Sequence, residues 1–143
     1  MIKRTKYNSK KIEIDNMKFD SADESKYYLY LKDLKEKGEV RYFLLQPKYV
    51  LIPKFVYFGE KRRELTYTAD FLVYYPDGTF EAIDIKGFSS QQTEIRRKMF
   101  EYKFPNEKLT WIARNLKHGN DGWIEYDQLK KIRAKNKKEK RTE

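Results

Sequence analysis

Apolar and polar residues alternate in short runs along most of the chain, and these runs predict a succession of strands and helices. Residues 12–19 alternate around an Asp-Asn pair, which predicts a short hairpin. Residues 21–38 instead follow a helical period. Ser21 is a candidate N-cap, Glu24 stands three residues later as in a capping box, and Gly38 is a candidate stop. The first long element is therefore predicted to be a helix.

The remaining runs predict a sheet covered by further helices. Apolar, β-rich stretches predict strands at 40–52, 66–75, 79–86 and 109–113, while helical spacing predicts helices at 91–102 and about 124–134. The first strand is broken by Gln46-Pro47, and a Pro-Asp-Gly turn separates the second from the third. The order helix, three strands, helix, strand predicts an α/β fold with a mixed central β-sheet flanked by helices.

Composition narrows the class of protein. The chain has 143 residues, a formal charge of +10, no cysteine and one histidine. A disulfide scaffold, a thiolate zinc site and a cysteine nucleophile are excluded, and a histidine-based triad is disfavoured. No apolar run is long enough to span a membrane, and the basic N-terminus lacks the apolar region of a secretory signal. We expect a soluble, cytoplasmic protein with a polyanionic partner.

The positive charge is concentrated at the two ends. Residues 1–11 hold five basic residues and no acid, residues 130–143 carry a net charge of +6, and residues 12–129 carry −1. We expect a basic N-terminal arm, a folded domain over 12–129 and a basic C-terminal tail. Both ends are predicted to bind nucleic-acid phosphates, or else to be solvated segments that aid solubility; the candidate contacts are Lys3, Arg4, Lys130, Lys131 and Arg133.

Two aspartates stand within the apolar strands at 66–75 and 79–86. If Tyr75 pairs with Thr79 across the turn, Asp70 lies directly opposite Asp84, and Lys86 shares their face of the sheet. Facing carboxylates repel unless a cation lies between them. Oxygen ligands without histidine or cysteine favour a hard cation, Mg²⁺ or Mn²⁺, which polarises phosphoryl oxygens and activates water. The alternative is a buried Asp–Lys ion pair that holds the hairpin together.

A third acid, Glu24, lies within the apolar stripe of the first helix, near the end where the helix starts. This position points its carboxylate toward the sheet, where it could join the two aspartates. The alternative is the capping box with Ser21. The Glu24 carboxylate cannot easily cap the helix and bind a metal ion at the same time.

This arrangement resembles the PD-(D/E)XK nuclease superfamily, whose members have a glutamate on the first helix, an acid on the second strand and (D/E)-x-K on the third. The stretches FDSADESKYY, LLQPKYVL, YTADFLVYY and AIDIKGF, within residues 12–115, look more specifically like small phage and prophage endonucleases. That group is related to RecU-type Holliday junction resolvases and to the endonuclease subunit of Tn7-like transposases. The chain departs from the superfamily pattern at Ala69, where a proline often precedes the first acid.

The resemblance implies a restriction-endonuclease-like core and Mg²⁺- or Mn²⁺-dependent hydrolysis of DNA phosphodiesters in the cytoplasm of a bacterial or phage-infected cell. Asp70, Asp84 and the backbone carbonyl of Ile85 would be metal ligands, and Lys86 the catalytic lysine. Glu24 would bind a second metal ion or a water molecule on the metal.

Other residues are candidates for contacts with nucleic acid. The Gln46-Pro47 break could direct Gln46 toward the site, although a surface position at a strand break is the alternative. Arg97 and Lys98 lie on the helix at 91–102, where either could bind phosphate or face solvent. Phe88 could stack on bases, but packing in the core is favoured.

The leading hypothesis is therefore a DNA endonuclease of phage recombination, with branched DNA and a homodimeric resolvase as its most specific form. A DNA-binding accessory protein that keeps the fold without catalysis is the alternative. A nuclease that acts on RNA is a third class.

Overall fold

The computed structural model describes residues 11–142 and confirms a mixed α/β fold. Its elements follow the order β1 (Ile12–Ile14), β2 (Met17–Phe19), α1 (Ala22–Glu36), β3 (Tyr42–Leu45), β4 (Lys48–Ile52), β5 (Phe55–Tyr57), β6 (Glu60–Arg62), β7 (Leu65–Thr68), β8 (Phe71–Tyr74), β9 (Phe80–Ile85), α2 (Gln91–Lys103), β10 (Leu109–Arg114), β11 (Trp123–Glu125) and α3 (Tyr126–Thr142). The central sheet has the strand order β11-β10-β9-β8-β3. Only β9 and β10 pair in parallel within it, so the predicted mixed sheet is confirmed.

Helix α1 covers one face of this sheet, and its ends are those that the sequence predicts. The Ser21 hydroxyl accepts the Glu24 N–H at 3.1 Å, which caps the start of the helix. Gly38, at φ +79°, follows the C-cap residue in the left-handed conformation that glycine adopts without strain. Tyr27, Tyr28 and Leu31 are buried against Phe71, Val73 and Ile83 of the sheet.

The other two helices cover the opposite face. Phe100 of α2 is fully buried, and its ring lies against those of Tyr49, Tyr67 and Phe104. The first turns of α3 pack Leu129 against Trp111 and Ala113 of β10. The sheet is therefore covered on both sides, as its two-sided apolar strands require.

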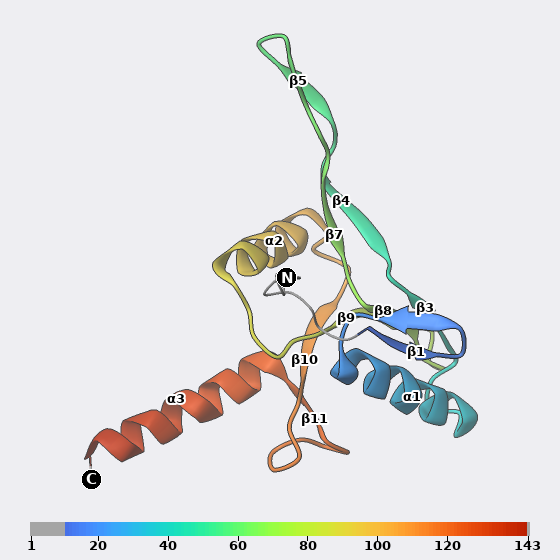
Figure 1. The fold of residues 1–143 in the computed structure, drawn as a ribbon, viewed down its shortest axis with the longest axis vertical. Helices are drawn as coiled ribbons and strands as arrows, with labels where there is room; N and C mark the ends of the chain where they lie inside the picture. Colours follow the sequence, from blue (N-terminus) through green and yellow to red (C-terminus); the bar gives the residue numbers. More distant parts are fainter. Residues whose placement is uncertain (1–10, 143) are drawn as a thin grey trace, which may run out of the picture.

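A single long β-hairpin connects the sheet to a ribbon that projects from it (Figure 1). Leu45 pairs with Phe71 in the sheet and Lys48 pairs with Thr68 above it, in one continuous register that shifts by one residue only after Val50. β5 and β6 extend this pairing to a tip where Phe58 and Gly59 both have positive φ. The outer part, residues 48–68, is called the ribbon below. The sequence analysis predicted neither β5 nor β6.

The hairpin bends where the ribbon leaves the sheet, and this bend corrects one prediction. We expected one strand over 66–75 with Asp70 in its middle, but the strand is broken at Ala69-Asp70. The opposite strand breaks at the same level, where Gln46 has φ +52° and Pro47 supplies no N–H. Gln46 N–H donates to the Asp70 carbonyl at 2.9 Å and Ala69 N–H to the Pro47 carbonyl at 3.1 Å, so the two strands bend while still paired.

Helix α3 extends further than the sequence pattern predicts. We expected a helix ending near residue 134 and a separate tail from 130, whereas α3 continues to Thr142 and contains that boundary. No residue after Ile132 is buried, so the basic part of α3 extends away from the domain (Figure 1). Among residues 11–142, no helix is long and apolar enough to cross a membrane.

The packing of α2 gives a test of the fold. We expect Phe100→Ala to lower the free energy of unfolding by about 3–5 kcal/mol, because the cavity removes contacts with three aromatic rings. Urea denaturation measures this loss. Tyr102→Ala on the same helix is the control, because Tyr102 is 90% exposed and should cost less than about 0.5 kcal/mol. Equal losses in the two variants would contradict the packing.

Candidate active site

The two aspartates face each other as the sequence predicts. β8 pairs with β9 so that Phe71 lies opposite Ile83, and Asp70 therefore lies opposite Asp84. The Asp70 N–H donates to Asp84 Oδ1 at 3.0 Å, and the Ile85 N–H donates to Asp70 Oδ2 at 2.7 Å. Each carboxylate thus accepts a backbone N–H from the other strand.

This exchange of hydrogen bonds has a structural cause. Beyond Asp70 the ribbon leaves β9, and the Ile85 N–H takes the Asp70 carboxylate as its acceptor in place of the regular ladder. The Asp70 N–H is shared between the Ile83 carbonyl at 3.1 Å and Asp84 Oδ1. An unpaired buried N–H is costly, so the Asp70 carboxylate stabilises the end of the ladder and the Asp84 carboxylate adds a second acceptor there. The aspartates therefore stabilise the bend, whatever else they do. Among the described residues, no hydrogen bond to the second oxygen of Asp70, Oδ1, is present.

The pair is electrostatically strained. Burial, the Asp84 carboxylate and Glu24 together raise the pKa of Asp70 to about 8. Asp84 is itself only 4% exposed. A cation placed between the two side chains would remove this repulsion and favour both charged forms.

Glu24 approaches from α1 and reaches the same region. Burial raises its pKa, and the nearby carboxylates of Asp20 and Asp84 raise it further, while a hydrogen bond from the Asp20 backbone N–H and the charge of Lys86 oppose this. Glu24, Gln46 and Asp70 line a cavity of about 20 Å³ at the bend. A cavity of that size holds about one water molecule or a single ion. The predicted placement of Gln46 beside the acids is therefore found in the structure.

Asp84 and Lys86 border a second, larger space on the side of α2. The Lys86 Nζ lies 3.6 Å from Asp84 Oδ2, and the ammonium also lies over the ring of Trp111 at 5.0 Å. The space is about 300 Å³ and polar, and its other lining residues are Thr66, Tyr67, Thr68, Gln92, Thr93 and Arg96. The two facing aspartates thus border different cavities, Asp70 the small one with Glu24 and Asp84 the larger one with Lys86.

The fit to a divalent cation can be judged from the donor atoms. Asp70 and Asp84 supply oxygen ligands at facing positions, and the small cavity adds the oxygens of Glu24 and Gln46. These are the ligands that Mg²⁺ and Mn²⁺ prefer. Within residues 11–142, however, no group of three or more acidic, histidine or cysteine side chains is close enough together to hold an ion. A site would consist of two carboxylates supplemented by neutral oxygens.

The candidate residues on α2 separate onto different sides of the helix. Arg97 forms a two-pronged ion pair with Asp127, with N–O distances of 3.0–3.2 Å, and its guanidinium lies 4.0 Å from the centre of the Trp111 ring. Arg97 therefore has a packing role, although it was predicted to bind phosphate. Arg96, which the sequence argument did not select, borders the polar pocket and donates to the Thr66 carbonyl at 3.3 Å.

Helical spacing could have identified Arg96. It lies one turn after Gln92 and Thr93, the first residues of α2 to line the pocket that contains Lys86.

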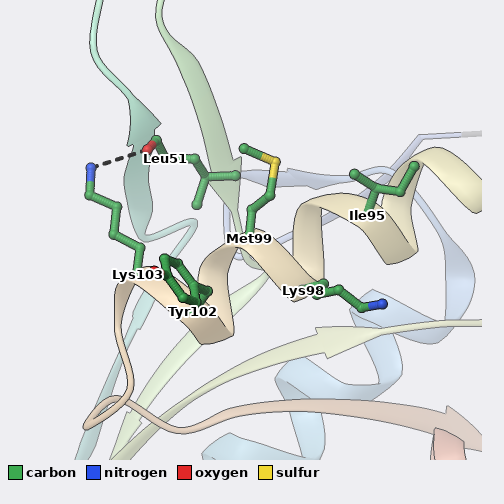
Figure 2. A pocket seen from close by; sticks show the side chains of 6 residues that line it. All are labelled: Leu51, Ile95, Lys98, Met99, Tyr102 and Lys103. Atoms are coloured by element: carbon green, nitrogen blue, oxygen red, sulfur yellow. Dashed lines mark hydrogen bonds between the residues drawn. The ribbon is translucent and has the colours of Figure 1, made fainter.

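Lys98 lines a different surface, an apolar groove between α2 and the base of the ribbon (Figure 2). The groove measures about 500 Å³ and is lined by Leu51, Ile95, Met99 and Tyr102 beside Lys98 and Lys103. Lys103 Nζ donates to the Val50 and Leu51 carbonyls at 2.7 and 3.2 Å, which ties α2 to the ribbon. The groove is the larger of the two, but it has no acid and no polar cluster.

The remaining candidates lie toward the ends of the chain. Lys130 pairs with Glu94 at 3.1 Å, whereas Lys131 and Arg133 are exposed on α3. Lys3 and Arg4 fall outside the described residues. Phe88 is 83% exposed, so its predicted packing in the core is wrong. It follows β9 and Gly87 in a polar connection that offers no apolar surface to bury it.

Comparison with known proteins places the chain in a family. Residues 4–120 match the model of a family described as "Protein of unknown function (DUF1064)", and the chain belongs to it. No curated protein and no solved structure matches the chain. The family description carries no activity, so a function has to be argued from the site.

The raised pKa of Asp70 predicts how stability changes with pH. The folded state holds this proton more tightly than the unfolded state, whose usual value is 3.8. The resulting stabilisation is complete below that value and is lost as the pH rises toward about 8. In EDTA, we expect the free energy of unfolding to decrease between about pH 5 and about pH 8, by up to about 4 kcal/mol.

Asp70→Asn is the matched variant for this measurement. Its amide oxygen can still accept the Ile85 N–H, but it has no charge to bury. Urea denaturation across the pH range should therefore give a flatter profile for Asp70→Asn than for the parent protein. Identical profiles would contradict the electrostatic strain at Asp70.

Proposed function

We propose that this protein is a metal-dependent endonuclease that hydrolyses DNA phosphodiester bonds. The observation that carries the proposal is the facing pair Asp70 and Asp84, with Lys86 directly after β9. Asp84 and Lys86 border a polar pocket that Arg96 also lines, while Asp70 lines the small cavity beside Glu24. The resemblance of the surrounding sequence to PD-(D/E)XK nucleases supports the same assignment. Water is added across one P–O ester bond, so that one product carries a phosphate monoester and the other a hydroxyl group that receives the proton.

The metal would be held by the side chains of Asp70 and Asp84 and by the Ile85 carbonyl, with Glu24 available for a second ion. When bound, Mg²⁺ or Mn²⁺ supplies a Lewis acid for a phosphoryl oxygen and lowers the pKa of water. The carboxylate pair favours a cation, because a positive charge would offset the burial and the repulsion from Asp84 that together raise the pKa of Asp70.

The other residues of the pocket act on the phosphate directly. The Lys86 ammonium is held beside Asp84, where it can donate to a phosphoryl oxygen and stabilise the negative charge that develops during hydrolysis. Arg96 and Thr93 line the same pocket and supply further donors for a phosphate. In this assignment Lys86 takes part in the reaction, while Arg96 binds and orients the strand.

Two cationic surfaces outside the pocket support a nucleic-acid substrate. The exposed part of α3 carries Lys131 and Arg133 and continues as a basic helix to Thr142. The ribbon carries exposed cations beside exposed aromatic residues, a combination suited to phosphates and unstacked bases; these are Lys54, Lys61, Arg62, Arg63, Phe55, Tyr57 and Phe58. We propose that both surfaces contact DNA, and that a homodimer making paired cuts acts on branched DNA.

The second candidate is a DNA-binding protein without catalytic activity. It is favoured by the mutual capping of backbone donors by Asp70 and Asp84, which gives both aspartates a structural role without a metal. It predicts DNA binding that EDTA does not affect, and no cleavage of any substrate.

Asp84→Asn separates the two candidates. The asparagine amide keeps an acceptor for the Asp70 N–H but removes the charge that would hold a cation. We expect cleavage of linear, nicked and four-way junction DNA in Mg²⁺ or Mn²⁺ to fall by at least about 100-fold, with DNA binding in EDTA retained. Gel analysis of labelled DNA measures the rate, and an RNA competitor tests the class of nucleic acid.

Asp33→Asn is the control for that experiment, because Asp33 is an exposed aspartate of α1 whose side chain pairs with Lys37. Its cleavage rate should equal that of the parent protein. A parent protein that binds DNA but cuts none of the three substrates would support the second candidate. Undiminished cleavage by Asp84→Asn would contradict the catalytic assignment.

The basic surface of α3 gives an independent prediction. Removing two phosphate contacts with Lys131→Ala/Arg133→Ala should reduce the slope of log K against log salt concentration by about 2. Fluorescence anisotropy between about 50 and 200 mM salt measures the slope. Lys35→Ala/Lys37→Ala, at the end of α1, makes the same change in net charge and should leave the slope unaltered. Equal slopes in the two variants would rule out α3 as a contact surface.

A further inference from the structure

A buried chain of hydrogen bonds joins three strands behind the candidate site. The indole N–H of Trp111 on β10 donates to the Tyr67 hydroxyl at 2.8 Å, and that hydroxyl, on β7, donates in turn to Asp84 Oδ2 on β9. Trp111 is 2% exposed, while Tyr67 and Asp84 are each 4% exposed. No other buried side chain of the described residues approaches Asp84 with a hydroxyl group.

The donors and acceptors in this chain fix the direction in which the Tyr67 hydroxyl donates its proton. A tyrosine hydroxyl has one proton to donate. Because the hydroxyl accepts from Trp111, whose indole can only donate, its own proton is directed to Asp84. The other oxygen of Asp84 accepts the Asp70 N–H at 3.0 Å. Both oxygens are therefore fixed, and the plane of the carboxylate is set by groups outside the reaction.

Trp111 also contacts the second functional side chain. The Lys86 Nζ lies over its ring at 5.0 Å, and the same ammonium is 3.6 Å from Asp84 Oδ2. Arg97, held by Asp127, lies over the ring as well and helps to fix it. One indole thus positions the carboxylate through its N–H and Tyr67, and the ammonium through its face.

We propose that Tyr67 and Trp111 are positioning residues, which hold the Asp84 carboxylate and the Lys86 ammonium in a fixed relation before substrate and metal bind. The inference rests on the function proposed above. Its physical basis is preorganisation: a flexible lysine and a rotating carboxylate would otherwise have to be ordered during the reaction. Groups that orient metal ligands in this way typically change metal affinity or activity by about 10–100-fold when removed.

Tyr67→Phe tests the proposal, since it removes the hydroxyl and retains the ring that packs on Phe100. We expect the kcat for DNA cleavage and the affinity for Mn²⁺ alone to fall by about 10–100-fold each, with the KM for DNA unchanged. Binding of Mn²⁺ without DNA is measured from the electron paramagnetic resonance signal of the free ion. A residue that only stabilises the fold would lower the free energy of unfolding and leave both quantities in the folded protein unaltered.

Tyr75→Phe is the matched control. The Tyr75 hydroxyl also donates to a carboxylate of this hairpin, that of Glu81, at the end of the sheet remote from the site. Tyr75→Phe should leave the kcat for DNA cleavage and the affinity for Mn²⁺ unchanged. A double variant gives a second measure: once Asp84→Asn is present, adding Tyr67→Phe should lower Mn²⁺ affinity no further, because Tyr67 acts through Asp84.

The outcomes distinguish this proposal from the function on which it rests. A parent protein that binds Mn²⁺ and cuts DNA, with Tyr67→Phe equal to Tyr75→Phe, overturns the positioning role alone. A parent protein that does neither overturns both. If Tyr67→Phe does not fold, Trp111→Phe replaces it; this variant keeps the tyrosine but removes its donor, and we expect a loss of about 3–10-fold, whereas no loss would overturn the proposal.

Discussion

The structure depends on how the long hairpin leaves the central sheet. At that point the regular ladder between β8 and β9 ends; the Asp70 carboxylate accepts the Ile85 N–H, and the Asp84 carboxylate shares the Asp70 N–H with the Ile83 carbonyl. The bend in the opposite strand, at Gln46 and Pro47, lets both strands turn together and keep their pairing. The same two side chains are the centre of the candidate site. Stability of the bend and chemistry at the site therefore compete for the same atoms, with one oxygen of each aspartate used by the backbone.

The electrostatics of the region follow from this constraint. Burial of Asp70 raises its pKa, and the neighbouring carboxylates of Asp84 and Glu24 raise it further, because the three acids cannot all carry charge there without cost. The basic residues around them have different partners: Lys86 faces Asp84, Arg96 borders the pocket, and Arg97 belongs to the packing of α2 against α3 and Trp111. The positive net charge of the chain, by contrast, lies mainly in the terminal segments rather than at the acids.

The features that could be predicted from the sequence are those fixed by local chemistry. The Pro-Asp-Gly turn set the register that places Asp70 opposite Asp84, and Ser21 and Gly38 marked the ends of α1. The tip of the ribbon could not be predicted, because Phe58 takes a positive φ that a bulky residue rarely adopts. The extent of α3 was missed, since no buried residue after Ile132 gives the helix an apolar period. Tyr67 on β7 and Trp111 on β10 belong to separate sheets and meet only in the tertiary fold, which single-residue patterns do not encode.

The ribbon has a mechanical consequence for the acids at its base. It is a two-stranded extension whose far end is exposed to solvent and whose base includes the peptide unit of Asp70. A molecule that binds the far end and displaces the ribbon would shift that peptide, and with it the carboxylate of Asp70. Lys103 opposes such a displacement, because it holds the ribbon to α2 through two carbonyls of β4. The position of the outermost residues and the spacing of the two aspartates are therefore geometrically linked.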